Sequence, residues 1–263
     1  MNNKFAVITG GSSGIGFELA KLLVKDDFNI LIGGYSDRVF DAVDELKKIN
    51  IKVDIDGIKT DLSTEEGITE FLSKIGDKNV DLLVLNAGRS LGGAFIEHPI
   101  ETHLELLALN ITSILKISHS LLPSMIKKGS SKILLTSSLS ATTPTPYEGI
   151  YGATKAFLSS FGNGLREELI GTGIQLTILH PGATATTFHD RAGMGETQFG
   201  DNSWKNDPAV VAQQGYQALL RGQTNVVGGD ADTQRAWNEN QILSEEEKAR
   251  RFAESSKPNK KTK

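Results

Sequence analysis

Short apolar runs alternate with longer amphipathic segments along almost the whole chain, and this rhythm constrains the fold more than any other feature. Short runs suit strands, and segments with apolar residues at helical spacing suit helices. Their alternation predicts a parallel sheet with helices on both faces, a three-layer, doubly wound α/β domain. We expect strands over Phe5–Thr9, Asn29–Ile32, Lys52–Ile58, Asp81–Leu85, Lys132–Thr136, Gln175–Leu179 and Asn225–Val227. We expect helices over Ile15–Lys25, Val39–Ile49, Thr64–Lys74, Ile100–Met125, Tyr151–Leu169 and Pro208–Leu220.

No linker divides the chain, so we expect one domain over residues 1–240, followed by a polar C-terminal helix and frayed tail over residues 241–263. The Gly/Asn/Asp-rich stretch Gly193–Asp207 breaks the rhythm and is too long for an ordinary connection. It predicts a mobile substrate loop over about residues 183–207. The segment after Gly229 fits no element of the pattern. Apolar side chains in the loop suggest a lid, namely Phe188, Met194, Phe199 and Trp204.

Composition excludes several other classes of protein. The chain has no cysteine, which excludes disulfides, thiolate metal sites and cysteine nucleophiles. Its formal net charge of −4 gives no electrostatic footprint for nucleic acid. The N-terminal apolar stretch is too short for a signal peptide, and no run of about 18 apolar residues predicts a membrane span. We therefore expect a cytoplasmic protein that binds neither nucleic acid nor membrane, and no metal because the histidines lack metal spacing.

A glycine-rich turn follows the first predicted strand and opens the first predicted helix. Glycines let the backbone approach a pyrophosphate closely, and the N–H groups and dipole of the helix start favour an anion. The spacing G-x-x-x-G-x-G predicts a dinucleotide site, although an ordinary glycine-rich turn remains an alternative. Candidate cofactor contacts in this turn are Gly10, Ser12, Ser13, Gly14, Ile15 and Gly16.

The same turn also fits G-x-S-x-G, the nucleophile elbow of hydrolases, with Ser12 as the nucleophile. Only one strand precedes this turn, whereas an elbow sits in the middle of a sheet. The context therefore argues against a hydrolase, which remains an alternative that a Ser12→Ala variant would separate.

A second set of residues carries acid–base chemistry. Tyr151 and Lys155 are four residues apart on a predicted helix, so they share a face. A tyrosine has an ordinary pKa of about 10, and a neighbouring ammonium group would lower it toward neutrality. Ser138 ends the preceding strand, where its hydroxyl could hold a substrate oxygen. We therefore expect Tyr151 to act as general acid or base, although a tyrosine and a lysine at this spacing are often surface residues.

These motifs, in this order, resemble the single-domain branch of the short-chain dehydrogenase/reductase family over about residues 4–228. The resemblance implies a Rossmann-type sheet and a catalytic set of Ser138, Tyr151, Lys155 and Asn110. In this family the asparagine holds a water in a proton relay to the lysine, and the lysine also holds the nicotinamide ribose. The resemblance further implies cofactor contacts at Asp61, Leu62, Asn86, Ala87, Gly88, Pro181, Gly182, Thr184 and Thr186, besides Tyr151 and Lys155.

The choice of cofactor depends on the end of the second predicted strand. NAD-binding relatives place an acid there, but this chain reads Gly33-Gly34-Tyr35-Ser36. Tyr35 could stack on adenine, Ser36 could bond a 2′-phosphate and Arg38 could neutralise it. These residues favour NADP, with NAD as the alternative because Asp37 is an acid close to the strand end.

We therefore expect an oxidoreductase that transfers a hydride between a nicotinamide cofactor and a small carbonyl or alcohol substrate. A non-catalytic dinucleotide-binding sensor or scaffold on the same fold is the alternative. The resemblance implies a homodimer or homotetramer, because family members pair through the helices that carry the equivalents of Asn110 and Tyr151.

Overall fold

The computed structural model describes residues 4–258 and contains a seven-stranded, fully parallel sheet in the order β3-β2-β1-β4-β5-β6-β7. The chain winds outward from β1 to β3, then crosses back and winds the other way from β4 to β7. This confirms the predicted doubly wound α/β domain. The strands are β1 Phe5–Thr9, β2 Asn29–Gly34, β3 Ile55–Lys59, β4 Leu82–Leu85, β5 Lys132–Thr136, β6 Gln175–Pro181 and β7 Asn225–Gly228.

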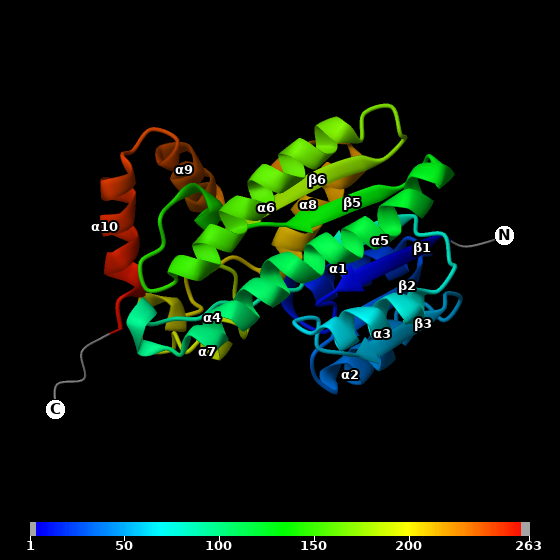
Figure 1. Cartoon of the computed structure of the whole chain (residues 1–263), viewed down its shortest axis with the longest axis horizontal. Coiled ribbons are helices and arrows are strands. Elements are labelled where there is room, and N and C mark those ends of the chain that lie inside the picture. The colour runs from blue at the N-terminus through cyan, green and yellow to red at the C-terminus, as the bar shows by residue number, and fades with distance from the viewer. Residues whose placement is uncertain (1–3, 259–263) are drawn as a thin grey trace.

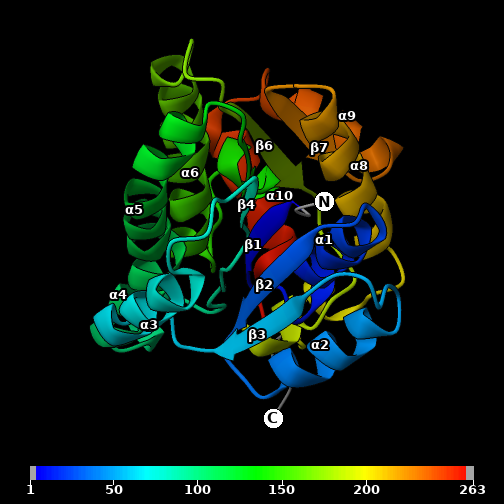
Figure 2. The same ribbon diagram turned by 90° about the vertical axis from the view of Figure 1, so that its right-hand side faces the viewer.

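Helices cover both faces of this sheet, as Figures 1 and 2 show. Helices α3, α5 and α6 lie on one face, and α1, α2 and α8 lie on the other. The helices are α1 Gly14–Lys25, α2 Arg38–Lys47, α3 Glu65–Ile75, α4 Ile100–Leu107, α5 Ser113–Lys128, α6 Gly149–Glu168, α7 Phe188–Arg191, α8 Pro208–Leu220, α9 Ala231–Asn240 and α10 Glu245–Ser256. Single turns occupy η1 Phe95–Glu97, η2 Ala108–Thr112, η3 Leu139–Thr142 and η4 Gln198–Gly200.

The core follows from the two-residue repeat of the strands. Ile8 of β1 faces the α1–α8 layer, whereas its neighbour Val7 faces the α5 layer. Val7 is in register with Leu31 of β2 and Leu83 of β4, so the pattern continues across the sheet. Each fully buried aliphatic side chain contributes about 1.5–3 kcal/mol, which is why these strands are apolar on both faces.

Several predicted boundaries differ from the structure by one or two residues, and two elements differ by more. The strand expected over Lys52–Ile58 begins only at Ile55, because the side chain of Asn50 accepts a hydrogen bond from the backbone of Lys52 and holds a turn there. The helix expected over Ile100–Met125 runs on to Lys128, but a π-turn at Ala108–Thr112 separates α4 from α5. π-turns inside helices often mark functional positions.

The helical stretch Ile100–Lys128 is long and apolar enough to cross a membrane by length and composition alone, with a mean hydropathy of 1.3 over its most apolar window. Of that window, 39% is buried inside the molecule. Ile114, Ile117 and Leu121 belong to the core beside β1 and β4. The apolar character of this stretch is therefore accounted for in part by packing against the sheet.

The segment that the sequence left without a place forms two further helices at one end of the molecule (Figure 1). Asp230 caps α9 by accepting a hydrogen bond from the backbone of Thr233, and Ser244 caps α10 in the same way through Glu247. The predicted C-terminal helix is thus α10. Of the helix and tail predicted over residues 241–263, residues 259–263 lie outside the described residues.

Candidate functional site

A cavity of about 1100 Å³ opens at the carboxyl edge of the sheet. Its walls come from the turns after strands β1 to β5, from the loop after β6, and from helices α6, α9 and α10. In doubly wound sheets a crevice forms at this edge where the strand order reverses, here between β1 and β4. The fold therefore brings segments far apart in the sequence to one site.

The glycine turn after β1 forms one end of this cavity and leads directly into α1, which begins at Gly14. Gly10 and Gly14 both have positive φ, at 67° and 56°, which favours glycine at these two positions. A Cβ atom on Gly16 would lie 2.2 Å from the carbonyl oxygen of Gly10. The turn Gly10–Gly16, here called the glycine cradle, therefore has no room for a side chain at Gly16, which fits the close approach of a pyrophosphate. Gly16 itself is buried behind the cavity wall.

Asn86, which follows β4, holds this turn in place. Its Nδ2 donates to the carbonyl oxygens of Thr9 and Gly10 at 3.3 and 3.2 Å, and its Oδ1 accepts from Thr136 Oγ1 at 3.3 Å. The side chain of Asn86 therefore connects the ends of β1, β4 and β5. Ala87 and Gly88 continue along the cavity wall.

The segment after β6 reaches the glycine turn from the opposite side. A Cβ atom on Gly14 would lie 3.0 Å from Cγ2 of Thr186, so the two segments nearly touch. Pro181, Gly182 and Thr184 also line the cavity, and Thr184 donates to the carbonyl of Gly182 at 2.8 Å. These predicted cofactor residues are therefore brought together around one space.

The end of β2 forms the outer part of this wall. Tyr35 lines the cavity with 76% of its surface exposed, a ring free to stack on a flat ligand. Ser36 and Arg38 do not line the cavity. Asp37 forms an ion pair of 2.9 Å with Lys59 at the end of β3. No sequence pattern indicates Lys59 as a partner, yet its ammonium group compensates the carboxylate that argues against NADP.

Asp61 and Leu62, after β3, also line the cavity near Tyr35. The carboxylate of Asp61 accepts hydrogen bonds from the backbone and hydroxyl of Ser63 at 2.9 and 2.6 Å. One oxygen of Asp61 is therefore committed to its own turn.

Ser138, Tyr151 and Lys155 meet in the middle of the cavity wall, and all three are buried. Ser138 follows β5, and its Oγ accepts a hydrogen bond of 3.0 Å from the backbone of Ser140, which leaves its O–H free to donate. Tyr151 and Lys155 lie one turn apart on α6, with the lysine Nζ 5.7 Å from the centre of the tyrosine ring. Lys155 Nζ also donates to the carbonyl of Thr136 at 3.0 Å.

Burial dominates the acid–base behaviour of this group. Burial raises the pKa of Tyr151 above its ordinary value, the nearby Ser138 hydroxyl acts against the rise, and the charge of Glu148 adds to it. Burial lowers the pKa of Lys155 to about 8. The outcome differs from the predicted lowering of the Tyr151 pKa, because desolvation disfavours the charged form of both groups. The phenol is consequently protonated near neutral pH.

Asn110 lies in the π-turn η2, fully buried behind the cavity wall rather than lining it. Its Oδ1 accepts from the backbone N–H of Arg89, while its Nδ2 donates to the carbonyl of Arg89 and to Thr154 Oγ1. A Cβ on Gly88 would lie 3.3 Å from Asn110 Oδ1 and 3.5 Å from Lys155 Nζ. Asn110 therefore positions the Gly88–Arg89 backbone beside Lys155.

The position of the glycine turn does not exclude the hydrolase alternative. β1 is an interior strand, so the turn after it lies in mid-sheet, as both a dinucleotide site and a nucleophile elbow require. Ser12 packs against Gly34, where an added Cβ would lie 2.9 Å from Ser12 Oγ. Among the described residues Ser12 has no histidine bonded to it, as a hydrolase nucleophile requires.

A sequence model of the family described as short chain dehydrogenase matches residues 4–196. The chain belongs to the short-chain dehydrogenase family. It is 32% identical over 209 residues to a serine 3-dehydrogenase of Rhizobium radiobacter, a match that covers 78% of this chain and 82% of that protein. These similarities show that the chain belongs to a family of oxidoreductases.

Solved structures of other short-chain dehydrogenases share the fold. One from Sphingobium yanoikuyae in complex with NADPH superposes with a TM-score of 0.80 at 23% identity, covering 90% of this chain and 93% of that one. One from Burkholderia phymatum in complex with NAD gives a TM-score of 0.79 at 20% identity, covering 89% and 92%. Both nicotinamide dinucleotides thus occur among the neighbours.

In this short-chain dehydrogenase the sequence missed two polar residues of the cavity wall. Glu148 is 3% exposed and Ser90 is 5% exposed, and both line the cavity. Glu148 lies three residues before Tyr151, a spacing that the sequence could have offered as a signal. No pattern in the sequence indicates Ser90. Among residues 4–258, no cluster of three or more histidine, aspartate and glutamate side chains could hold a metal ion.

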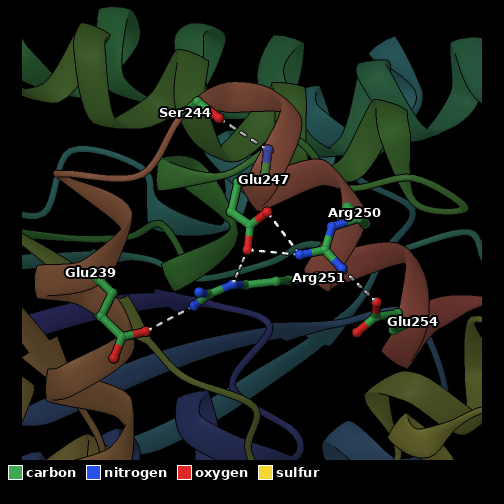
Figure 3. A network of polar contacts seen from close by, with 6 residues as sticks. All are labelled: Glu239, Ser244, Glu247, Arg250, Arg251 and Glu254. Atoms are coloured by element: carbon green, nitrogen blue, oxygen red, sulfur yellow. Dashed lines mark hydrogen bonds and ion pairs between the residues drawn. The ribbon is translucent and has the colours of Figure 1, made fainter.

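The sequence also missed the wall that α9 and α10 provide. An ion-pair network joins the two helices, with Arg251 bonded to both Glu239 of α9 and Glu247 of α10 (Figure 3). Helix α10 is also hydrogen-bonded to the segment before α6. Lys248 donates to the carbonyl of Thr142 at 3.1 Å, and Ser256 donates to the carbonyl of Pro146 at 2.8 Å.

An aromatic series connects this wall to the catalytic candidates. The Tyr151 ring lies 5.4 Å from Phe188, which lies 5.4 Å from His189. His189 stacks on Phe199 at 5.0 Å, and Phe199 contacts Phe252 of α10 at 5.7 Å. Of the residues predicted to form a lid, Phe188, Phe199 and Trp204 line the cavity, whereas Met194 is buried beneath the loop. The predicted mobility of this loop stays a prediction.

Proposed function

We propose that this short-chain dehydrogenase interconverts a small ketone or aldehyde with its alcohol, using Tyr151 as general acid and base. The observation that carries the proposal is the convergence of Ser138, Tyr151 and Lys155 on one wall, beside a glycine cradle that fits a pyrophosphate. The bound nicotinamide would supply or accept the hydride. The substrate end of the cavity would take a small molecule.

The resting geometry suits the reductive direction. Burial keeps the phenol of Tyr151 protonated, as required of a group that gives a proton to a carbonyl oxygen. Ser138 has a free O–H to donate to the same oxygen and stabilise developing charge. Lys155 is held beside Tyr151 by Thr136, where it would bind the ribose hydroxyls and favour the phenolate once the proton has left.

The cofactor that we propose is NADP, with NAD as the alternative. The end of β2 carries no acid that would bond the ribose hydroxyls, and the carboxylate of Asp37 is paired with Lys59. A 2′-phosphate would therefore meet a neutral ion pair. Ser36 and Arg38 do not line the cavity, so their hydroxyl and guanidinium would bond a phosphate that extends beyond Tyr35. Tyr35 would stack on the adenine.

We also propose that the protein is a homodimer or homotetramer. The long helices α4, α5 and α6 leave large apolar side chains exposed, including Leu104 at 54%, Ile126 at 42% and Phe157 at 39%. In a contact between copies of the chain these side chains would be removed from water. Sedimentation velocity tests this, since a chain of 28.4 kDa that sediments as a monomer would contradict it.

The deciding experiment combines cofactor binding with turnover. Fluorescence titration with NADPH and with NADH gives the two dissociation constants, and Tyr151→Phe is then assayed with aldehydes and ketones. We expect kcat to fall by about 10²–10⁴-fold with cofactor affinity nearly unchanged, because only the transferable proton is lost. Tyr216→Phe removes a hydroxyl that bonds Asp26 away from the cavity, and it should leave kcat intact.

Two outcomes would contradict this proposal. Full activity in Tyr151→Phe would remove the tyrosine from the chemistry. Tight cofactor binding without reduction of any aldehyde or ketone would instead favour the sensor or scaffold.

A further inference from the structure

Glu148 is a buried acid beside the catalytic candidates for which the fold has no use. It is the residue that precedes α6, yet its side chain makes no capping hydrogen bond to that helix. Its Oε1 is buried without a hydrogen-bond partner among the described residues. A carboxyl group placed in this way costs stability, so its retention points to a ligand that completes it.

The backbone around Glu148 holds the side chain at the cavity wall. Tyr147, just before it, adopts a φ of 63°, which is strained for a residue other than glycine. The backbone N–H of Glu148 donates to the carbonyl of Thr145 at 2.9 Å, and its carbonyl accepts from Thr145 Oγ1 at 2.9 Å. Gly93 N–H also bonds the carbonyl of Tyr147 at 2.9 Å. Both backbone groups of Glu148 are thus bonded, whereas its carboxyl Oε1 is not.

Ser90 lies near Glu148 on the same wall and is also incomplete. Its Oγ is buried and has no hydrogen-bond partner of normal geometry among residues 4–258. The hydroxyl is close enough to favour the ionised form of the carboxyl, but burial dominates and raises the pKa of Glu148 to about 8. The carboxyl keeps an acceptor oxygen in either protonation state, so a donor group on a ligand would bond it.

The position of Glu148 relative to Tyr151 fixes where that donor must be. Glu148 is the N-cap residue of α6 and lines the same cavity as Tyr151, close enough for its charge to act on the Tyr151 phenol. A substrate oxygen bonded to Tyr151 would therefore place its neighbouring carbon atoms near Glu148. A methyl or methylene group there would leave the carboxyl unsatisfied.

We propose that Glu148 and Ser90 form a substrate-recognition site that selects carbonyl compounds carrying a second hydrogen-bond donor, a hydroxyl or an ammonium group, next to the reacting carbon. This rests on the proposed function, because Tyr151 must hold the reacting oxygen. The aromatic series from Phe188 to Phe252 would face the apolar remainder of the substrate.

The test compares substrates that differ in one group. The methyl ketones are 1-hydroxypropan-2-one, butan-2-one and 1-aminopropan-2-one. The phenyl ketones are 2-hydroxy-1-phenylethanone, 1-phenylpropan-1-one and 2-amino-1-phenylethanone, each with the varied group on the carbon next to the carbonyl. For the native chain we expect kcat/KM to favour a donor-bearing ketone over its alkyl partner by about tenfold or more, since a site built for a donor rejects the analogue without one.

Variants then assign that preference to the two residues. Glu148→Ala should bring the ratio to within about twofold, chiefly by lowering kcat/KM for the donor-bearing ketone, and Ser90→Ala should reduce it in part. Glu148→Gln separates the two sources of the donor, because an amide keeps a bond to a hydroxyl but loses the attraction for an ammonium group. Glu168→Ala, on the exposed end of the same helix, is the control.

The results distinguish this inference from the proposed function. If the native chain reduces both ketones of a pair equally, or if Glu148→Ala and Ser90→Ala leave the ratio unchanged, the recognition site is wrong and the reductase function stands. If the native chain reduces no ketone or aldehyde with NADPH or NADH, both proposals fall. Melting temperature and cofactor affinity of each variant show whether the fold is intact.

Discussion

The cofactor end and the substrate end of the cavity are held together by different kinds of atoms. At Gly10 and Gly16 the turn is backbone alone, bonded by Asn86 and held by contacts too close for a side chain at either glycine. Around Glu148 the wall is made of side chains from α6, α9 and α10, several of them charged. The first end can bind one shape of ligand, whereas the second can change its specificity by exchanging side chains.

The largest expected effect breaks the cofactor end alone. In Gly16→Ala the new Cβ would lie 2.2 Å from Gly10 O and 2.5 Å from Asn86 Nδ2, and the backbone cannot yield without opening the cradle. We expect NADPH affinity to fall more than about 100-fold and stability by about 1–3 kcal/mol. Fluorescence titration and urea unfolding measure both quantities.

Gly164→Ala is the matched control, because an added Cβ there meets nothing within 4 Å. It should keep cofactor affinity and gain about 0.5–1 kcal/mol of helix stability. Normal cofactor binding by Gly16→Ala would show that the cradle tolerates side chains after all.

The next effect concerns the free energy of unfolding that is lost by burying the carboxyl of Glu148. The pKa of Glu148 is about 8 in the folded chain against 4.5 for an ordinary glutamate, so the folded state holds the extra proton between these values. Stability therefore falls as pH rises from about 4.5 to 8 and is level above that. Glu148→Gln should be more stable than the native chain by about 1–3 kcal/mol at pH 8.5, and by little at pH 4.5.

Urea unfolding of both proteins at several pH values measures this difference, in which the titration of all other groups cancels. Glu168→Gln, on the exposed end of α6, is the control. A gain of the same size at pH 4.5 and pH 8.5 would contradict the buried charge as its cause.

A smaller effect separates the two ends of the cavity. Lys248→Met removes the hydrogen bond from α10 to the carbonyl of Thr142, in the loop that carries Glu148. We expect KM for the ketone to rise about threefold to tenfold with cofactor affinity within about twofold. Steady-state kinetics of Arg250→Met, an exposed cation on the same helix, should match the native chain. Equal losses of cofactor and substrate affinity in Lys248→Met would mean that the ends are not independent.

The smallest effect sharpens the choice of cofactor. Lys59→Met leaves the carboxylate of Asp37 without its partner, and the free charge would repel a 2′-phosphate. We expect the ratio of NADPH to NADH affinity to fall about threefold. Lys74→Met, which breaks the ion pair with Asp56 elsewhere on β3, should leave the ratio unchanged. If the affinities for NADPH and NADH fall by the same factor, Lys59 stabilises the fold and does not discriminate between the two cofactors.

The sequence predicted the sheet and the catalytic wall because both depend on local patterns. The period of the apolar residues determines strand and helix, and the spacing of Tyr151 and Lys155 is set by the helix itself. The glycine turn was visible for the same reason. The family resemblance implied Asn86 only as a cofactor contact. Its hydrogen bonds to the turn were not predicted, since no local pattern links residues 77 positions apart.

The substrate end could not be predicted in the same way. Glu148 faces the cavity because of a strained turn at Tyr147, and Lys59 meets Asp37 only through the pairing of β2 with β3. Helices α9 and α10 are polar on most of their surface, so their apolar pattern is too weak to predict their place. Side-chain contacts between distant segments determine this region, and such contacts leave no local signal.

The position of α9 and α10 after the last strand has a consequence for the order of events during synthesis. Every strand and the glycine turn are made before α9 begins, because β7 ends at Gly228. Residues 229–256, which include α9 and α10, take roughly 1–6 s to add at common rates of translation. During that interval the nascent chain contains every strand and the glycine turn, but lacks the part of the cavity wall that α9 and α10 provide. The cavity is therefore completed from its glycine end toward the wall beside Glu148.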